Sequence, residues 1–440
     1  MKICMMTNTY LPHIGGVAKS VSTFADEYIR QGHEVLVVAP TFPGKPLPPE
    51  REAIVERVPS LQNFNGSDFS VRLPFAAALS ERLDAFDADI IHAHHPFLLG
   101  DTALRVAMNK NVPMVFTHHT RYEDYTHYVP FSDTLRDIAI GLPTHFANLC
   151  DGVIAPSESI ARLIRRRGVK APMTVIPTGI DIAAFASADG RRARARYNLP
   201  PDTFVVGHVG RLAQEKNLQM LGEAAAEFLV RDTGAHFLVV GDGPARDEFA
   251  AIFARRRVEN RLILAGRRTG PALREAYRAM DVFAFTSRSE TQGMVVAEAM
   301  AAGLPVVALN APGVREVVRS DNGILLPAHA TVSDFADALA SLAMDPARRE
   351  ERSRAATETA TEFSRERSAS RVLAFYDEMR RATRGRRLEH DLHPWSALLK
   401  RLGLEWDILA AHTQTLASAM FGEPKEKAPV DDDALAAGPR

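Results

Sequence analysis

Short apolar runs alternate with longer mixed stretches along most of the chain. Runs of about four to eight apolar residues are typical of strands buried on both faces of a sheet, and the intervening stretches are long enough for helices. Strands are predicted at residues 2–7, 33–39, 88–93, 113–117, 152–155, 174–176, 204–209, 236–240, 262–265, 282–285, 305–308 and 323–326. This alternation predicts an α/β protein whose parallel sheets carry helices on both faces.

The length of the chain predicts two domains and an extension. A chain of 440 residues exceeds the size of one ordinary hydrophobic core. The first set of strands ends within residues 175–181, where we place the domain boundary. The predicted parts are an N-terminal Rossmann-like domain (1–179), a C-terminal Rossmann-like domain (180–363), a helix (364–383), a helical extension (384–421) and a tail of disordered composition (422–440).

Composition narrows the class of protein and its expected location. A net charge of −1 argues against a general nucleic-acid binder, which needs an excess of cations. Cys4 and Cys150 lie in or beside apolar segments, so buried reduced thiols and a cytoplasmic location are expected. The N-terminus turns polar too soon for a signal peptide, and no apolar run approaches the ~18 residues that span a bilayer. Membrane contact is therefore expected to be peripheral, on the inner face.

The run Ser-Arg-Ser-Glu-Thr-Gln-Gly-Met at residues 287–294 lies at a predicted strand-to-helix turn. Such turns line the ligand crevice of an open parallel sheet, and a helix N-terminus offers backbone N–H groups to an anion. Gly293 permits close approach of the backbone, and the carboxylates of Glu290 and Glu298 can accept hydrogen bonds from hydroxyls. A polyol that carries phosphate therefore fits this run, because its phosphate can accept from the helix N-terminus and its hydroxyls can donate to the carboxylates. Alternatively, Glu290 is a turn residue and Glu298 complements the helix dipole.

Other strand-end turns offer groups for a phosphate. Residues 210–217 contain Arg211 and Lys216, a bidentate fork and a point charge that suit a diphosphate, although such residues are often plain surface. A glycine pair that precedes the first helix either contacts phosphate or sugar or forms a plain turn. Weaker candidates lie in the loops after two further predicted strands, 236–240 and 262–265. These additional positions are Gly15, Gly16, Gly210, Asp242, Gly266 and Arg267.

Histidines gather after two predicted strands. His92, His94 and His95 follow one, and His118 and His119 follow the next. Zinc is the rival explanation because imidazoles cluster around metals. No cysteine joins the histidines, so we expect hydrogen-bond donors that face a crevice, and no metal.

Charged stretches elsewhere have simpler explanations. The helix between Ser157 and Gly168 carries cations in its last turn, which complement the helix dipole or suit an anionic membrane. Residues 191–196 are expected to form a solvated helix face, and residues 87–89 a solvated turn. The extension has an apolar stripe at helical spacing that packs on the body of the protein or on an interface: Trp395, Leu398, Leu399, Leu402, Trp406 and Leu409.

Residues 1 to about 382 resemble a known enzyme family. Glu290 and Glu298, followed by Ala-Met-Ala-x-Gly-x-Pro-Val-Val, resemble the donor-sugar motif of the retaining glycosyltransferases of family 4. The run at residues 116–128 resembles the segment of bacterial diacylglycerol glucosyltransferases that carries the active-site histidine. That match places the histidine at His119 and acceptor-side tyrosines at Tyr122 and Tyr125. The resemblance implies the GT-B fold, in which two Rossmann-like domains face each other across a cleft.

The resemblance also implies roles for the candidate residues. Arg211 and Lys216 would stabilise the departing diphosphate, and Glu290 would hold hydroxyls of the donor sugar. Glu298 would hold the ribose, and His119 would position the sugar. The full nucleotide-sugar set is Gly15, Gly16, Gly210, Arg211, Lys216, Asp242, Gly266, Arg267, Glu290, Thr291, Gln292, Gly293, Met294 and Glu298. Retention would proceed by front-face attack, without a cofactor or a metal.

The expected reaction moves a hexose, most simply glucose from UDP-glucose, to a hydroxyl of a lipid such as diacylglycerol at an anionic membrane surface. The same chemistry on a soluble sugar or sugar phosphate is the first alternative. A sugar-nucleotide 2-epimerase shares the GT-B architecture, but the glutamate spacing argues against it. A nucleotide-sugar-binding regulator without catalysis is the third alternative.

Overall fold

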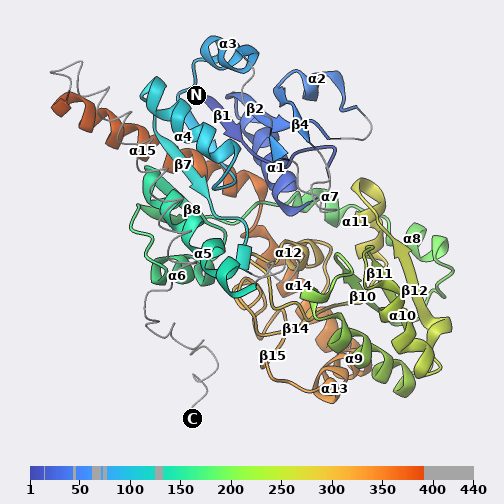
Figure 1. Ribbon diagram of the computed structural model, residues 1–440. Coiled ribbons are helices and arrows are strands. Elements are labelled where there is room, and N and C mark those ends of the chain that lie inside the picture. The colour runs from blue at the N-terminus through green and yellow to red at the C-terminus, as the bar shows by residue number, and fades with distance from the viewer. Residues whose placement is uncertain (14, 43–45, 62–70, 73–76, 124–131, 391–440) are drawn as a thin grey trace. The chain divides into compact units, whose positions relative to one another are not determined.

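The computed structural model describes residues 1–13, 15–42, 46–61, 71–72, 77–123 and 132–390. The described chain forms two compact units (Figure 1). Unit 1 contains residues 1–179 together with the helix that begins at residue 365, and unit 2 contains residues 180–364. Tyr125, the apolar stripe of the extension and the polar tail lie outside the described residues.

Unit 1 is built on a seven-stranded parallel sheet. The strand order is β3 (Val55–Val58), β2 (Glu34–Pro40), β1 (Lys2–Met6), β6 (Ile90–Ala93), β7 (Met114–Thr117), β8 (Gly152–Ala155) and β9 (Met173–Val175). Its helices are α1 (Gly16–Arg30), α2 (Pro49–Glu52), α3 (Ala77–Phe86), α4 (Leu99–Lys110), α5 (Ser132–Leu149), α6 (Glu158–Arg166) and α15 (Arg365–His390). A short antiparallel pair, β4 (Ser60–Leu61) and β5 (Val71–Arg72), stands apart.

Successive residues of each strand point to opposite faces and build two separate cores in unit 1. Cys4 and Met6 pack with α4, α5 and α6, whereas Ile3 and Met5 pack with α1 and α15. The C-terminal helix therefore completes one face of the first sheet. It runs without interruption through residue 383 to His390.

Unit 2 repeats this plan with a six-stranded parallel sheet. The strand order is β12 (Leu262–Gly266), β11 (His236–Val240), β10 (Val205–Val209), β13 (Val282–Phe285), β14 (Val306–Leu309) and β15 (Gly323–Leu326). Helices α7 (Ile182–Ala186), α8 (Gly190–Arg196), α11 (Gly270–Arg278), α12 (Met294–Ala301) and α14 (Pro346–Thr361) cover one face, and α9 (Leu218–Arg231), α10 (Arg246–Arg255) and α13 (Val332–Met344) cover the other. The predicted α/β class is confirmed.

The cysteine and helix-cap predictions are also confirmed. Cys4 and Cys150 are buried free thiols. Ser157 caps α6 by accepting a hydrogen bond from the backbone N–H of Ile160, and Gly168 follows the helix with a φ of +96°.

The structure departs from the sequence predictions at three places. The edge strand β3 was missed. Asp89 is not a solvated turn residue, because its carboxylate accepts from the backbone N–H of Lys2 at 2.8 Å and from Arg380 at 2.6 Å. Arg191, Arg192 and Arg196 are exposed as expected of a solvated helix face, but Arg194 pairs with Asp281 at 2.7 Å. Among the described helices, none is long and apolar enough to cross a membrane.

Candidate active site

The carboxyl ends of β10 and β13 bring two loops of unit 2 together. These strands are neighbours in the sheet, although two other strands separate them in the sequence. Nζ of Lys216, in the loop after β10, lies 2.6 Å from Oε1 of Glu290, in the turn after β13. The Oγ of Ser287 donates to the same carboxylate oxygen at 3.2 Å. The lysine and glutamate side chains are 18% and 17% exposed, so a ligand can reach this pair.

Several further hydrogen bonds fix the two loops to each other. The Nδ2 of Asn217 donates to the carbonyl of Thr286 at 3.2 Å, and the hydroxyl of Thr286 donates back to the carbonyl of Asn217 at 3.1 Å. The hydroxyl of Ser289 donates to the carbonyl of Glu215 at 3.1 Å. Lys216 and Glu290 are therefore held on a rigid frame, as a binding site requires.

The turn ends in a glycine that starts α12. Gly293 is the N-cap residue, with a φ of +73°, in the left-handed region that glycine adopts without strain. In the described chain no side chain caps this helix. Its dipole is therefore available to an anion. Of the other predicted residues here, Gln292 is buried, Thr291 is half-buried and Met294 is the first residue of α12.

Glu298 is placed differently from Glu290. It lies inside α12, is 2% exposed, and its Oε2 accepts a hydrogen bond from the hydroxyl of Tyr277 at 2.9 Å. Burial, and then the neighbouring carboxylate, raise the pKa of Tyr277, so its phenol is the donor. Glu298 is thus a buried acceptor behind the turn.

The remaining candidates of unit 2 lie on adjacent strand-end loops. Arg211 is exposed, and its Nη1 lies 4.0 Å from Oε1 of Glu215. Glycine is required at Gly241, because a Cβ there would meet the carbonyl oxygen of Gly210 at 1.8 Å. Asp242 and Arg267 are exposed, and Gly266 has a φ of +69°. Both cations, Arg211 and Lys216, therefore lie in the loop that follows Gly210, whose backbone packs closely on that of Gly241.

The predicted histidines of unit 1 lie at the carboxyl ends of β6 and β7. His92 bonds to the hydroxyls of Tyr376 and Thr117 at 2.5 and 2.7 Å, and Nδ1 of His95 accepts from the backbone N–H of Asn8 at 3.1 Å. Burial lowers the pKa of His92 and His95 to about 3, and that of His118 to about 4. These rings are neutral at pH 7. His92 and His95 form their hydrogen bonds in the interior rather than at a crevice surface, and Nδ1 of His118 is buried without a hydrogen-bond partner in the described structure.

His119 is half-buried, and its Nε2 lies 2.9 Å from Nδ1 of His94. Burial, and then the neighbouring histidines, hold the pKa of His119 well below its usual range. Within the described residues, no three His, Cys, Asp or Glu side chains are grouped so that they could hold a metal ion.

The loop after His119 contains an ion pair that the sequence did not reveal. Oε1 of Glu123 accepts from Arg167 at 2.6 Å and from Arg121 at 3.2 Å, and the Glu123 side chain is 3% exposed. The ring of Tyr122 packs edge-on against Phe97. Because Glu123 and Arg167 are 44 positions apart, no spacing rule connects them.

Gly15 and Gly16 lie at the start of α1.

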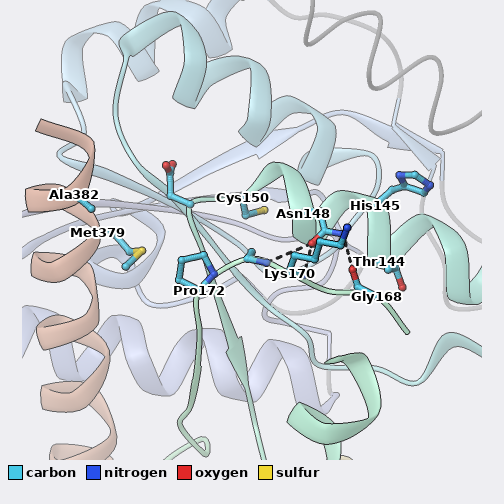
Figure 2. Close-up of a pocket in the computed structure, with 11 residues that line it drawn as sticks. Thr144, His145, Asn148, Cys150, Gly168, Lys170, Pro172, Met379 and Ala382 are labelled. Atoms are coloured by element: carbon cyan, nitrogen blue, oxygen red, sulfur yellow. Dashed lines mark hydrogen bonds between the residues drawn. The ribbon is translucent and has the colours of Figure 1, made fainter. Parts of the chain in front are cut away.

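A separate pocket lies at the opposite edge of the first sheet, before the amino ends of β8 and β9 (Figure 2). Its volume is about 880 Å³. Its lining is mainly apolar, with Lys170 and His145 among the polar residues, and comes from α5, the loop after α6, and Met379 and Ala382 of α15. It shares no residue with the histidine cluster.

Comparisons with known proteins agree across the chain. The family described as Glycosyltransferase Family 4 matches residues 14–184, and the one described as Glycosyl transferases group 1 matches residues 203–345. An alpha-monoglucosyldiacylglycerol synthase of Streptococcus pneumoniae is 31% identical over 72% of this chain and 73% of its own length. A GDP-mannose-dependent alpha-mannosyltransferase of Mycobacterium tuberculosis is 32% identical over 78% of this chain and 88% of its own. The crystal structure of Anabaena HepE in complex with UDP has a TM-score of 0.69 and 23% identity, covering 86% of this chain and 100% of HepE.

Proposed function

The chain belongs to glycosyltransferase family 4, and on this premise we propose that it transfers glucose from UDP-glucose to a hydroxyl of diacylglycerol with retention of configuration. The observation that carries the proposal is the Lys216–Glu290 pair at the ends of β10 and β13. A cation and a carboxylate 2.6 Å apart can hold the two chemically different ends of one ligand, a diphosphate and a sugar.

The proposed reaction breaks the bond between the anomeric carbon and the diphosphate oxygen. The acceptor oxygen forms its bond on the same face of the sugar, and its proton passes to the departing phosphate oxygen. Arg211 and Lys216 stabilise the negative charge that develops on the diphosphate, which is the dominant electrostatic contribution. Glu290 accepts from sugar hydroxyls, Glu298 supports the ribose side, and His119 donates a hydrogen bond to the sugar.

The lipid acceptor is supported by the named activity of the pneumococcal relative. The mycobacterial relative supports a second candidate donor, GDP-mannose, because its identity to this chain is similar.

Product analysis tests the reaction. We expect an alpha-linked glucolipid and free UDP when the protein is mixed with UDP-glucose and vesicles containing diacylglycerol. Transfer from GDP-mannose alone would replace the donor assignment. UDP release in vesicle-free controls that contain soluble sugars would move the acceptor to the soluble class, and absence of transfer with either donor would contradict the proposal.

A membrane-facing surface is proposed on α6. Arg162, Arg165 and Arg166 recur at helical spacing, are exposed, and have no ion-pair partner among the described residues, while Ile160 and Ile164 bury the opposite face. Exposed Lys170 extends this cationic surface to the mainly apolar pocket (Figure 2). Unpaired cations beside an apolar pocket suit anionic headgroups and acyl chains.

Charge reversal tests this surface. Replacing Arg162, Arg165 and Arg166 together with glutamate is expected to weaken sedimentation with anionic vesicles at least about 100-fold, since each lost cation contributes about 1 kcal/mol and the new carboxylates add repulsion. The control reverses an equal number of exposed arginines, Arg255–Arg257 of unit 2, two of which pair with Glu223, and should leave sedimentation unchanged. Equal losses in both variants would indicate a net-charge effect and overturn the assignment to α6.

A further inference from the structure

His119 is held by a second histidine from the neighbouring strand. His94 directly follows β6, and His119 lies two residues beyond the end of β7, with which β6 pairs in parallel. Nδ1 of His94 lies 2.9 Å from Nε2 of His119, and the ring planes are inclined by 24°. The pairing of the two strands therefore sets this contact.

His94 is itself fixed in place. Its backbone N–H donates to the carbonyl of Met6 at 2.9 Å, and its side chain is fully buried. Its ring packs on that of His92 at a centroid distance of 4.1 Å, and His92 is bonded at both nitrogens, to Tyr376 and Thr117. His94 therefore has little freedom to rotate.

The hydrogen-bond inventory favours one tautomer of this pair. Burial lowers the pKa of both rings well below the usual range, so each is neutral, with one donor and one acceptor nitrogen. Nε2 of His94 is buried without a hydrogen-bond partner in the described structure. A buried N–H without an acceptor is rarer and costly, whereas an unpaired acceptor is better tolerated. The proton of His94 is therefore placed on Nδ1, where it can donate.

We propose that His94 is a positioning residue for sugar transfer, because its Nδ1–H donates to Nε2 of His119. This bond fixes His119 in the tautomer that carries its proton on Nδ1, the N–H to which the proposed reaction assigns the hydrogen bond to the donor sugar. The inference rests on the proposed function, since it gives His119 its task there. Its physical basis is the general one that the partner of one imidazole nitrogen sets the proton on the other.

Two substitutions of His94 separate positioning from packing. His94→Leu removes the donor and is expected to lower kcat about 10- to 100-fold, with KM for the donor changed less than about threefold. His94→Asn supplies an amide N–H close to the position of Nδ1 and should recover kcat to within about threefold of wild type. The matched control is His95→Asn, a buried histidine on the same run that does not bond to His119, and its kcat should stay within about threefold.

A double-mutant cycle tests whether His94 acts through His119. The combination of His94→Leu with His119→Ala is expected to be no slower than His119→Ala alone. Multiplied losses, or equal losses in His94→Asn and His94→Leu, would overturn the proposal.

Nitrogen-15 NMR of histidine-labelled protein tests the tautomer without any activity. We expect His119, assigned by loss of its signals in His119→Gln, to carry its proton on Nδ1 in wild type and to become a tautomer mixture in His94→Leu. A proton on Nε2 of His119 in wild type would overturn the inference. A protein that shows this tautomer but no sugar transfer would refute the proposed function while retaining the His94–His119 hydrogen bond.

Discussion

Lys216→Ala is expected to lower kcat by about 10²- to 10³-fold, with a smaller rise in KM for the nucleotide sugar. Lys216 supplies a positive charge where the departing diphosphate becomes more negative, so its contribution is larger in the transition state than in the bound substrate. The residue is 18% exposed, and a charge that is partly withdrawn from water interacts more strongly than an exposed one. Steady-state kinetics with UDP-glucose and diacylglycerol vesicles measures the two constants separately.

The neighbouring groups sharpen this prediction. Arg211 is 50% exposed, so we expect a smaller loss of kcat in Arg211→Ala than in Lys216→Ala. Lys216→Arg keeps the charge but not the compact ammonium that contacts Glu290, and should recover part of the loss.

Lys110 provides a matched control, because it is also ion-paired, at 2.9 Å from Asp84, and is 16% exposed. Lys110→Ala should leave kcat unchanged. A Lys216→Ala enzyme with wild-type kcat and a raised KM would show that the cation binds substrate without stabilising the transition state.

The alternation of apolar runs was enough to predict both sheets, because strands buried on two faces leave continuous apolar segments. The edge strand β3 escaped prediction for the same reason. It reads Val-Glu-Arg-Val, and both inner positions are half-buried. A strand with one neighbour needs no continuous apolar run.

The candidate site was predictable as far as strand ends determine it. Lys216 and Glu290 both follow strands, and parallel strands end at one edge, so proximity was a reasonable expectation. The sequence does not show that β10 pairs with β13 rather than with β12, and this order decides that the two side chains meet.

Long-range pairings could not be read from spacing. Glu123 and Arg167 are 44 positions apart, and Arg194 and Asp281 are 87 apart. From the sequence, the arginines were expected to complement a helix dipole, suit a membrane or face solvent, and neither carboxylate was given a role. The depth of the histidine cluster was also unpredictable. It depends on α15, which contributes Tyr376 from 284 positions beyond His92.

Acidification from pH 7.5 to 5.5 is expected to destabilise unit 1 by about 7 kcal/mol, a large part of the stability of a domain. The groups responsible are His92, His94, His95, His118 and His119. Burial lowers the folded-state pKa to about 3 for His92 and His95 and to about 4 for His118, and it holds the pKa of His94 and His119 well below the usual range. In the unfolded chain histidine has a pKa of about 6.5, so the rings take up protons over this pH range, whereas the same rings in the folded chain stay neutral. The stability that these groups contribute is therefore present above pH 6.5 and lost as the pH falls towards the folded-state values, at about 1.4 kcal/mol per pH unit for each group.

Unit 2 should respond much less over the same range. His208 is its one fully buried histidine among the described residues with a pKa lowered as far as about 4, so a loss of about 1.4 kcal/mol is expected. Pulsed hydrogen exchange across a urea series reads the strands of the two sheets separately and should show the unfolding midpoint of unit 1 falling further than that of unit 2 between pH 7.5 and 5.5. His95→Gln removes one titrating group and should lower the slope for unit 1, which reduces the loss between pH 7.5 and 5.5 by about 1.4 kcal/mol. An unchanged slope in that variant would mean that His95 takes up its proton in the folded state as readily as in the unfolded chain, which its burial beside the backbone N–H of Asn8 opposes.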